Sequence, residues 1–158
     1  MTGASRKAKT IGVISDTHGL LRPEAKAALR GCDAIVHAGD IGKPEVLDQL
    51  AELAPLTAIR GNVDTWAADL PDTAVLTLDG RQFYVIHNFN DLDLDPQSAG
   101  FAGVISGHSH VPKTEMRDGV LYLNPGSAGP RRFKLPVSVA KSWVLKSRLD
   151  VQLLTLAV

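Results

Sequence analysis

The chain has 158 residues, of which 44% are hydrophobic, and this is enough to bury a core in one domain. Its 17 basic residues balance its 17 acidic ones, which argues against a nucleic-acid or membrane-surface partner. Cys32 is the only cysteine, so an internal disulfide and a thiolate metal cluster are excluded and a reducing, cytoplasmic location is favoured. No secretory signal or membrane-spanning run is apparent. We expect a single domain over residues 1–158 with a flexible start at residues 1–9.

The first half of the sequence predicts strands that alternate with helices. Apolar, β-branched runs indicate strands at residues 10–15, 33–38 and 56–59. Proline at a first turn, followed by apolar residues at helical spacing, predicts helices at residues 24–30 and from Pro44 to Pro55. This alternation favours a parallel sheet with right-handed crossovers.

The second half predicts mostly antiparallel strands. Asp79-Gly80 lies between predicted strands at 73–78 and 81–86, and Asp118-Gly119 lies between predicted strands at 113–116 and 120–123, which is typical of hairpin turns. Further segments complete the prediction: a strand at 103–106, a short helix at 98–102, and closing strands at 137–145 and 149–156. Together these elements predict an α/β fold in which a two-sheet β-sandwich is flanked by helices.

Polar residues follow five of the predicted strands directly. These segments are Asp16-Thr17-His18, Gly39-Asp40, Gly61-Asn62-Val63-Asp64, His87 and Gly107-His108-Ser109-His110. Open α/β sheets bind ligands beyond the carboxyl ends of their strands. In three segments a glycine precedes the polar residue, and glycine lets the backbone approach a bound group closely.

Each polar residue alone has an ordinary structural explanation. Asp16 could cap a helix, Asp40 and Asn62 could stand in turns, and His87 could be a satisfied core histidine. Together, imidazoles and carboxylates gathered at one sheet edge would be poorly solvated without a cation. The set therefore predicts a metal site.

In their order and spacing from residue 11 to 127, these segments and Asn124-Pro125-Gly126-Ser127 resemble the calcineurin-like metallophosphoesterases. Within that family, the chain is similar to the small bacterial and archaeal phosphodiesterase branch. The resemblance implies an αββα fold and two divalent transition-metal ions. It implies the following ligands: Asp16, His18 and His110 for the first ion, Asn62, His87 and His108 for the second, and Asp40 between them. Such mixed ligation suits manganese first, with iron, zinc, nickel or cobalt as alternatives.

The resemblance also implies the reaction, which is hydrolysis of a small phosphodiester by a metal-bridging hydroxide. Asp40, Asn62 and His108 would be catalytic, and Asn62 and Asp64 would contact the substrate. For Asp64, orienting water or Arg60 and a simple turn role stay equally open.

Three positions need separate comment. Many relatives carry histidine as a proton donor where this chain has Val63, so we expect good turnover of aryl diesters and poor turnover of alkyl monoesters. Asn88-Phe89-Asn90 replaces the glycine and histidine that follow His87 in many members of the branch, which puts substrate contacts there in doubt. His37 lies close to Asp40 in the sequence, so a role in orienting a metal ligand stays open, but we expect a core histidine bonded to a backbone carbonyl.

Two other functions stay open. The first is a non-catalytic interaction scaffold of the same fold, which would resemble the small retromer subunit. The second is a nuclease, although the balanced charge gives it no support. The sequence also leaves a homo-oligomer open.

Overall fold

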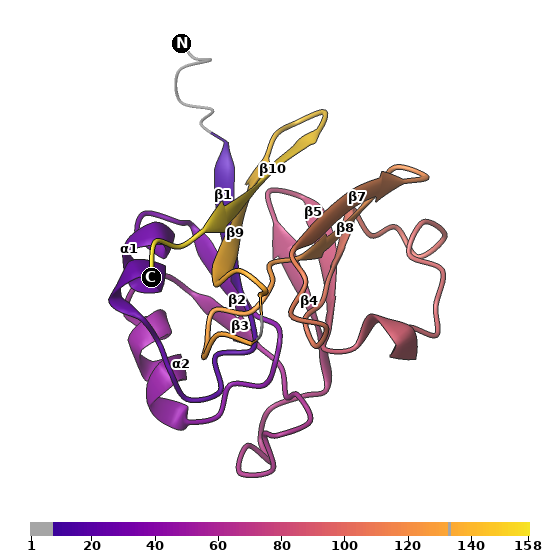
Figure 1. The fold of residues 1–158 in the computed structure, drawn as a ribbon. Coiled ribbons are helices and arrows are strands. Elements are labelled where there is room, and N and C mark those ends of the chain that lie inside the picture. Colours follow the sequence, from indigo (N-terminus) through magenta and orange to yellow (C-terminus); the bar gives the residue numbers. More distant parts are fainter. Residues whose placement is uncertain (1–7, 133) are drawn as a thin grey trace.

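Two five-stranded sheets form the core of the computed structural model, which describes residues 8–132 and 134–158 (Figure 1). The predicted flexible start lies mostly in residues 1–7, outside the described residues, and Lys9 already belongs to the first strand. None of the helices in the described part of the chain is long and apolar enough to cross a membrane.

The first sheet has the strand order β10-β9-β1-β2-β3. Its strands are β1 (Lys9–Ile14), β2 (Ala34–His37), β3 (Leu56–Ala58), β9 (Ser138–Val144) and β10 (Leu149–Thr155). β1, β2 and β3 are parallel, as predicted; β9 pairs antiparallel with β1, and β10 pairs antiparallel with β9. In the register of β1 and β2, Ile14 lies opposite His37, so the two strands end at the same level.

The second sheet has the strand order β4-β5-β6-β8-β7. Its strands are β4 (Thr73–Leu78), β5 (Arg81–Ile86), β6 (Gly103–Ile105), β7 (Lys113–Arg117) and β8 (Val120–Asn124). Both predicted hairpins are present, and β5, β6 and β8 run parallel in the middle of this sheet. The carboxyl ends of β5 and β6 therefore lie at one edge, as those of β1 and β2 do in the first sheet.

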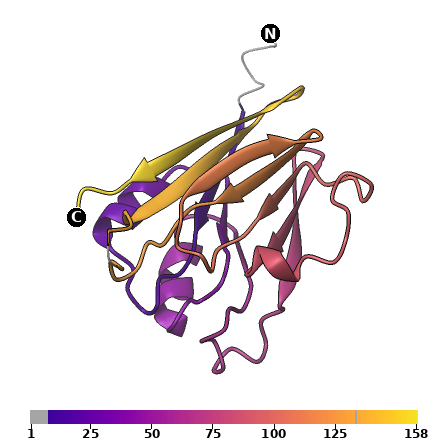
Figure 2. The ribbon, with the colours of Figure 1, turned by 45° about the vertical axis from the view of Figure 1, so that its right-hand side comes forward.

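Two hydrophobic cores hold the layers together. Residues such as Val13, Val36, Phe83 and Ile105 form the core between the sheets. On the other side of the first sheet, α1 (Pro23–Leu29) and α2 (Pro44–Ala51) pack buried leucines such as Leu29 against it. The two C-terminal hairpins, β7–β8 and β9–β10, lie next to each other along the sandwich (Figure 2).

The helices cover only one face of the sandwich. Across the outer face of the second sheet, the described chain has loops and one 3₁₀ turn, η2 (Phe89–Asp91), but no α-helix. The predicted helix at 98–102 is wrong, because this segment forms turns in which the Phe101 N–H donates to the Pro96 carbonyl. Gly100, at a φ of 84°, ends the segment before a helix can extend.

Candidate metal centre

The loops after β1, β2 and β6 hold the candidate ligands in an unusual backbone conformation. Asp16, His18, Asp40, His108 and His110 all have φ between 48° and 71°. Of the other described non-glycine residues, only the hairpin-turn residues Asp79 and Asp118 have positive φ. Each left-handed residue costs about 1–2 kcal/mol, and such strain typically gathers at functional sites. The backbone conformation that orients these five side chains therefore lowers the stability of the fold.

Asp16, His18 and His110 form the first group of candidate ligands. The Asp16 Oδ1 atom lies 4.0 Å from His18 Nε2 and 3.4 Å from His110 Nε2. The His18 and His110 rings lie 5.6 Å apart between centroids. These three side chains come from both sheets and offer one oxygen and two ring nitrogens to a shared point.

Asp40, His87 and His108 form the second group, whose potential ligand atoms lie within 4.8 Å of one another. The Asp40 Oδ2 atom is 3.3 Å from His87 Nε2 and also 3.8 Å from His18 Nε2 of the first group. One oxygen of Asp40 thus faces both groups. Asn62 is exposed beside His87, where both residues line an open cavity of about 570 Å³.

In Asp16 and in Asp40, one carboxylate oxygen accepts hydrogen bonds from the protein and the other does not. Asp16 Oδ2 accepts hydrogen bonds from Ser15 Oγ at 2.8 Å and from the His108 N–H at 3.1 Å. Asp40 Oδ1 accepts one from the Val63 N–H at 3.1 Å. The second oxygen of each carboxylate is left to face the histidines.

Several buried polar atoms at this site have no hydrogen-bond partner, and they indicate whether a cation would fit there. Within the described residues, Asp16 Oδ1, His18 Nε2 and His87 Nε2 are buried and have no hydrogen-bond partner. Unpaired polar atoms are costly when buried. The His87 Nδ1–H donates to the Ala38 carbonyl at 2.7 Å, which leaves the Nε2 lone pair free to bind a metal. Imidazole nitrogens and carboxylate oxygens are suitable donors for a divalent transition metal, so the residues fit such ions.

The pKa values of the two carboxyl groups are shifted in opposite directions. Burial raises the pKa of Asp16 to about 6. Burial alone would raise the pKa of Asp40 as well. The interactions with His87 and the Val63 N–H outweigh burial and lower the pKa of Asp40 to about 2. Asp40 therefore stays ionised over a wide pH range.

The histidines also differ in proton affinity. Burial lowers the pKa of His110 to about 4, with the charge of Arg132 adding to the effect, and burial likewise lowers the pKa of His18. Burial opposes protonation of His87 as well, but Asp40 and the Ala38 carbonyl outweigh it and raise the pKa of His87. Burial thus favours the neutral imidazoles in the first group, and the neutral imidazole is the form that binds a metal.

The three glycines that precede candidate ligands are needed for close backbone approach. A Cβ on Gly39 would come within 2.6 Å of His87 Nδ1. A Cβ on Gly61 would overlap the Asp40 carboxylate, and one on Gly107 would overlap Ser15 Oγ. The loops of the two sheets can interlock only because these side chains are absent.

Three supporting residues were assigned no role from the sequence: Ser15, Asn124 and Ser127. Asn124 Nδ2 donates to the Gly107 carbonyl at 2.8 Å, and Ser127 Oγ donates to the Asp16 carbonyl at 3.0 Å. Ser15 holds the Asp16 carboxylate as described above. The Asn-Pro-Gly-Ser segment was a sequence signal for these contacts, but the partners lie too far away along the chain to be inferred.

The structure does not place Asp64 where a substrate contact needs it. Asp64 is 1% exposed, and its carboxylate accepts hydrogen bonds from the Ile41, Gly42 and Gly61 N–H groups. Arg60, its other suggested partner, pairs with Asp72 at 2.9 Å. Asp64 therefore joins the loop after β2 to the loop after β3, and its position supports the turn role.

His37 is fully buried, as predicted, but its predicted partner is wrong. Its Nδ1 accepts a hydrogen bond from the Gly39 N–H at 3.1 Å, so Nε2 carries the proton and donates to Thr17 Oγ1 at 2.9 Å. Burial lowers the pKa of His37 to about 3, which keeps the ring neutral. His37 thus connects the loops that carry Asp16 and Asp40.

A two-sheet fold with paired histidine and carboxylate groups at its strand ends defines a protein of the metallophosphoesterase type. Comparison with known proteins agrees. The family model of the calcineurin-like phosphoesterase superfamily domain matches residues 10–144. The chain therefore belongs to this family.

Individual relatives support the same assignment. A probable metallophosphoesterase of Methanothermobacter thermautotrophicus is 32% identical over 157 residues, covering 91% of this chain and 91% of that protein. A phosphodiesterase of Methanocaldococcus jannaschii is 28% identical over 137 residues, covering 73% of this chain and 82% of its own. Vps29 of Chaetomium thermophilum aligns with a TM-score of 0.76 over 94% of this chain and 98% of its own. Its 19% identity shows a shared fold only.

Proposed function

We propose that this protein is a dinuclear metal-dependent phosphodiesterase. The observation that carries the proposal is Asp40 Oδ2, which lies 3.3 Å from His87 Nε2 and 3.8 Å from His18 Nε2 and so faces both ligand groups. A carboxylate oxygen that faces two sets of imidazoles could be shared as a ligand by two divalent cations.

The two groups, together with Asn62 beside His87, supply the ligands that we propose for the two cations. Asp16, His18 and His110 would hold one cation, and Asn62, His87 and His108 the other, with Asp40 shared between them. When bound, the cations supply Lewis acidity to the phosphoryl oxygens and lower the pKa of water; manganese is our first choice. Two divalent cations against two carboxylates leave a positive centre, which suits a phosphodiester monoanion.

The chain's own exposed groups would orient the substrate. Asn62 and His108 are both exposed beside the buried ligands, so they can contact the phosphate from the solvent side. The neighbouring Val63 has no proton to donate to a leaving group. We therefore propose that diesters with an aryl leaving group, which departs without protonation, are hydrolysed best.

Hydrolysis of bis(p-nitrophenyl) phosphate tests the proposal. We expect manganese to stimulate the reaction and Asp40→Asn to lower kcat/KM by about 100-fold or more, because a shared ligand loses its charge. Asp48→Asn is the matched control, since Asp48 is exposed on α2 and should leave the rate unchanged. A rate independent of manganese and of Asp40 would overturn the proposal.

A second candidate function is a non-catalytic interaction scaffold. The likeness in fold to Vps29, a protein of 19% identity, supports this alternative. A scaffold does not need unpaired ligand atoms in its interior, and this chain buries such atoms in both groups. Co-purification of a stoichiometric partner with the chelated, inactive Asp40→Asn protein would favour the scaffold.

A further inference from the structure

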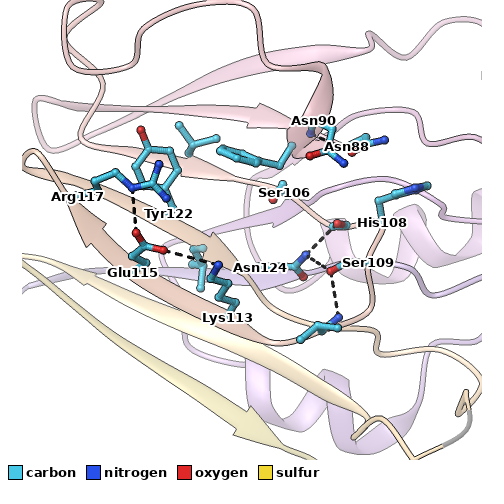
Figure 3. Close-up of a pocket in the computed structure, with 15 residues that line it drawn as sticks. Asn88, Asn90, Ser106, His108, Ser109, Lys113, Glu115, Arg117, Tyr122 and Asn124 are labelled. Atoms are coloured by element: carbon cyan, nitrogen blue, oxygen red, sulfur yellow. Dashed lines mark hydrogen bonds and ion pairs between the residues drawn. The ribbon is translucent and has the colours of Figure 1, made fainter.

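The outer face of the second sheet holds a cavity of about 240 Å³ that begins at the candidate metal centre (Figure 3). His108, a candidate ligand, and Asn88, the residue after His87, stand at one end of it. Glu115 and Arg117 stand at the other end, and Lys113 lies between the two ends. A group bound in this cavity would therefore lie directly beside anything bound to His108.

Aromatic side chains form one part of the cavity wall. The Phe89 ring lies edge-on to the Tyr122 ring, with 5.6 Å between centroids and an interplanar angle of 90°. The Arg117 guanidinium lies 4.9 Å from the centre of the same Tyr122 ring. Phe89 is 39% exposed, so its ring still has free surface for another ring.

The far end of the cavity is polar and carries ion pairs. Glu115 accepts a hydrogen bond from Arg117 Nε at 2.9 Å and lies 3.7 Å from Lys113 Nζ. Two cations against one carboxylate leave this end with donors for an electronegative ring edge. An apolar wall with a few polar groups at one end is typical of a small-molecule site.

The size of the cavity limits what it can hold. Sites for drug-sized ligands measure about 300–1,000 Å³, and this cavity is smaller. It suits one flat ring rather than a chain of nucleotides. Because the cavity starts at His108, a ring inside it can be joined to a phosphate at the metal centre.

We propose that this cavity binds an aromatic ester group of the phosphodiester, either a simple aryl ring or a single nucleobase, and that Phe89 and Tyr122 select for it. The inference rests on the proposed function, because it takes the phosphate to lie at the metal centre. It assigns a specificity role to Asn88-Phe89-Asn90, the segment that sets this chain apart from the branch it resembles.

Calorimetric binding of two phosphonates to the manganese-loaded protein tests this inference without any turnover. Phenylphosphonate and methylphosphonate offer the same phosphoryl oxygens but differ by the ring. We expect the phenyl compound to bind about tenfold more tightly, because the ring buries apolar surface in the cavity. In Phe89→Ala we expect this preference to fall to about threefold or less, because one face of the ring loses its partner.

Phe101→Ala is the matched control. Phe101 stacks on Tyr84 at 5.2 Å and is not among the residues lining this cavity, so its removal should keep the tenfold preference. Thermal unfolding of both variants checks that they fold. Equal binding of the two phosphonates, binding of neither, or a preference unchanged in Phe89→Ala would overturn the inference.

The binding experiment and the hydrolysis assay together separate this inference from the proposed function. If bis(p-nitrophenyl) phosphate is not hydrolysed but the phenyl preference depends on Phe89, the cavity is a ring-binding site and only the enzyme proposal fails. If the diester is hydrolysed and the preference is absent, the enzyme proposal stands and the cavity inference fails.

Discussion

Asp16 has a higher proton affinity than Asp40, the other carboxyl group among the candidate ligands. A cation that binds Asp16 must compete with this proton, so metal binding should depend on pH. Burial raises the pKa of Asp16 from 3.8 to about 6. Burial lowers the pKa of its partner His110 to about 4 and also lowers the pKa of His18, so protons compete less strongly for these two imidazoles. Below about pH 6 a cation must displace the Asp16 proton, and the raised pKa of His87 adds a second competing proton.

We therefore predict that manganese affinity falls by about tenfold per pH unit for each displaced proton, first as His87 is protonated and then, below about pH 6, also as Asp16 is protonated. Above the pKa values of both groups the affinity should level off, because no proton is left to displace. Calorimetric titration between pH 5 and 8 measures this. An affinity that is equal at pH 5 and pH 8 would show that the cation does not bind Asp16 or His87.

Val63 offers a second prediction for a single residue. Its side chain is 46% exposed, and only its backbone N–H contacts Asp40, so a new side chain can be added without removing that hydrogen bond. Val63→His adds a proton donor beside the site. We expect turnover of an alkyl phosphate monoester to rise by about tenfold or more, with a small change for aryl diesters.

Val63→Ala serves as the control for Val63→His, since it changes the side chain without adding a donor. Steady-state kinetics on both ester types distinguish the two variants. Unchanged alkyl-ester turnover in Val63→His would show that this position does not protonate the leaving group.

The loops that follow the strands are the elements on which the site depends. Asp16 N–H donates to the Gly39 carbonyl and His18 N–H to the Asp40 carbonyl, both at 3.0 Å, so the loops after β1 and β2 are tied together. A side chain at Gly61 would push into the Asp40 carboxylate from the loop after β3. Loop spacing thus determines where the ligand atoms lie.

We predict that Gly61→Ala lowers manganese affinity by about 10–100-fold and the free energy of unfolding by about 1–3 kcal/mol. Gly100→Ala is the control, because Gly100 has a φ of 84° but a Cβ added there would meet no atom within 4 Å. It should cost about 1–2 kcal/mol of stability and leave manganese affinity unchanged. Equal metal affinities in the two variants would contradict the role of Gly61.

The strands, and the polar residues that lie together at their ends, could be predicted from the sequence because their signals are local. Continuous β-branched runs mark β1 and β2, and glycine with a polar residue marks the turn after β2. The prediction of a helix at 98–102 was wrong because Pro96 and Gly100 favour turns, which the apolar pattern does not reveal. Proline and glycine chemistry outweighed the pattern there.

Contacts between distant segments could not be predicted. Asp64 accepts hydrogen bonds from N–H groups 22 and 23 residues away, and Phe89 meets Tyr122 across the second sheet. No spacing in the sequence shows that these groups will meet. Residue types therefore identified candidate ligands, while the supporting hydrogen bonds and the cavity beside His108 required the structure.

Over the whole molecule, the candidate metal centre joins the two sheets. Asp16, His18 and Asp40 follow strands of the first sheet, and His87, His108 and His110 follow strands of the second. The sheets also share the core between them, but at this edge their contact consists of polar groups, some of which are buried and unpaired in the two ligand groups. Bound cations would replace these unfavourable contacts with bonds between the sheets.

Metal removal should therefore destabilise the whole fold and not only the loops. With manganese at about 100 times its Kd, the folded state gains about 2.7 kcal/mol, which corresponds to a rise in Tm of roughly 5–10 °C for a chain of this size. A chelator should reverse the rise, and Asp40→Asn should show a smaller one because it weakens both groups at once. Differential scanning calorimetry with and without manganese measures these shifts, with Asp48→Asn as the control. A Tm that changes with neither manganese nor chelator would show that no cation joins the sheets. The unpaired buried atoms would then need another explanation.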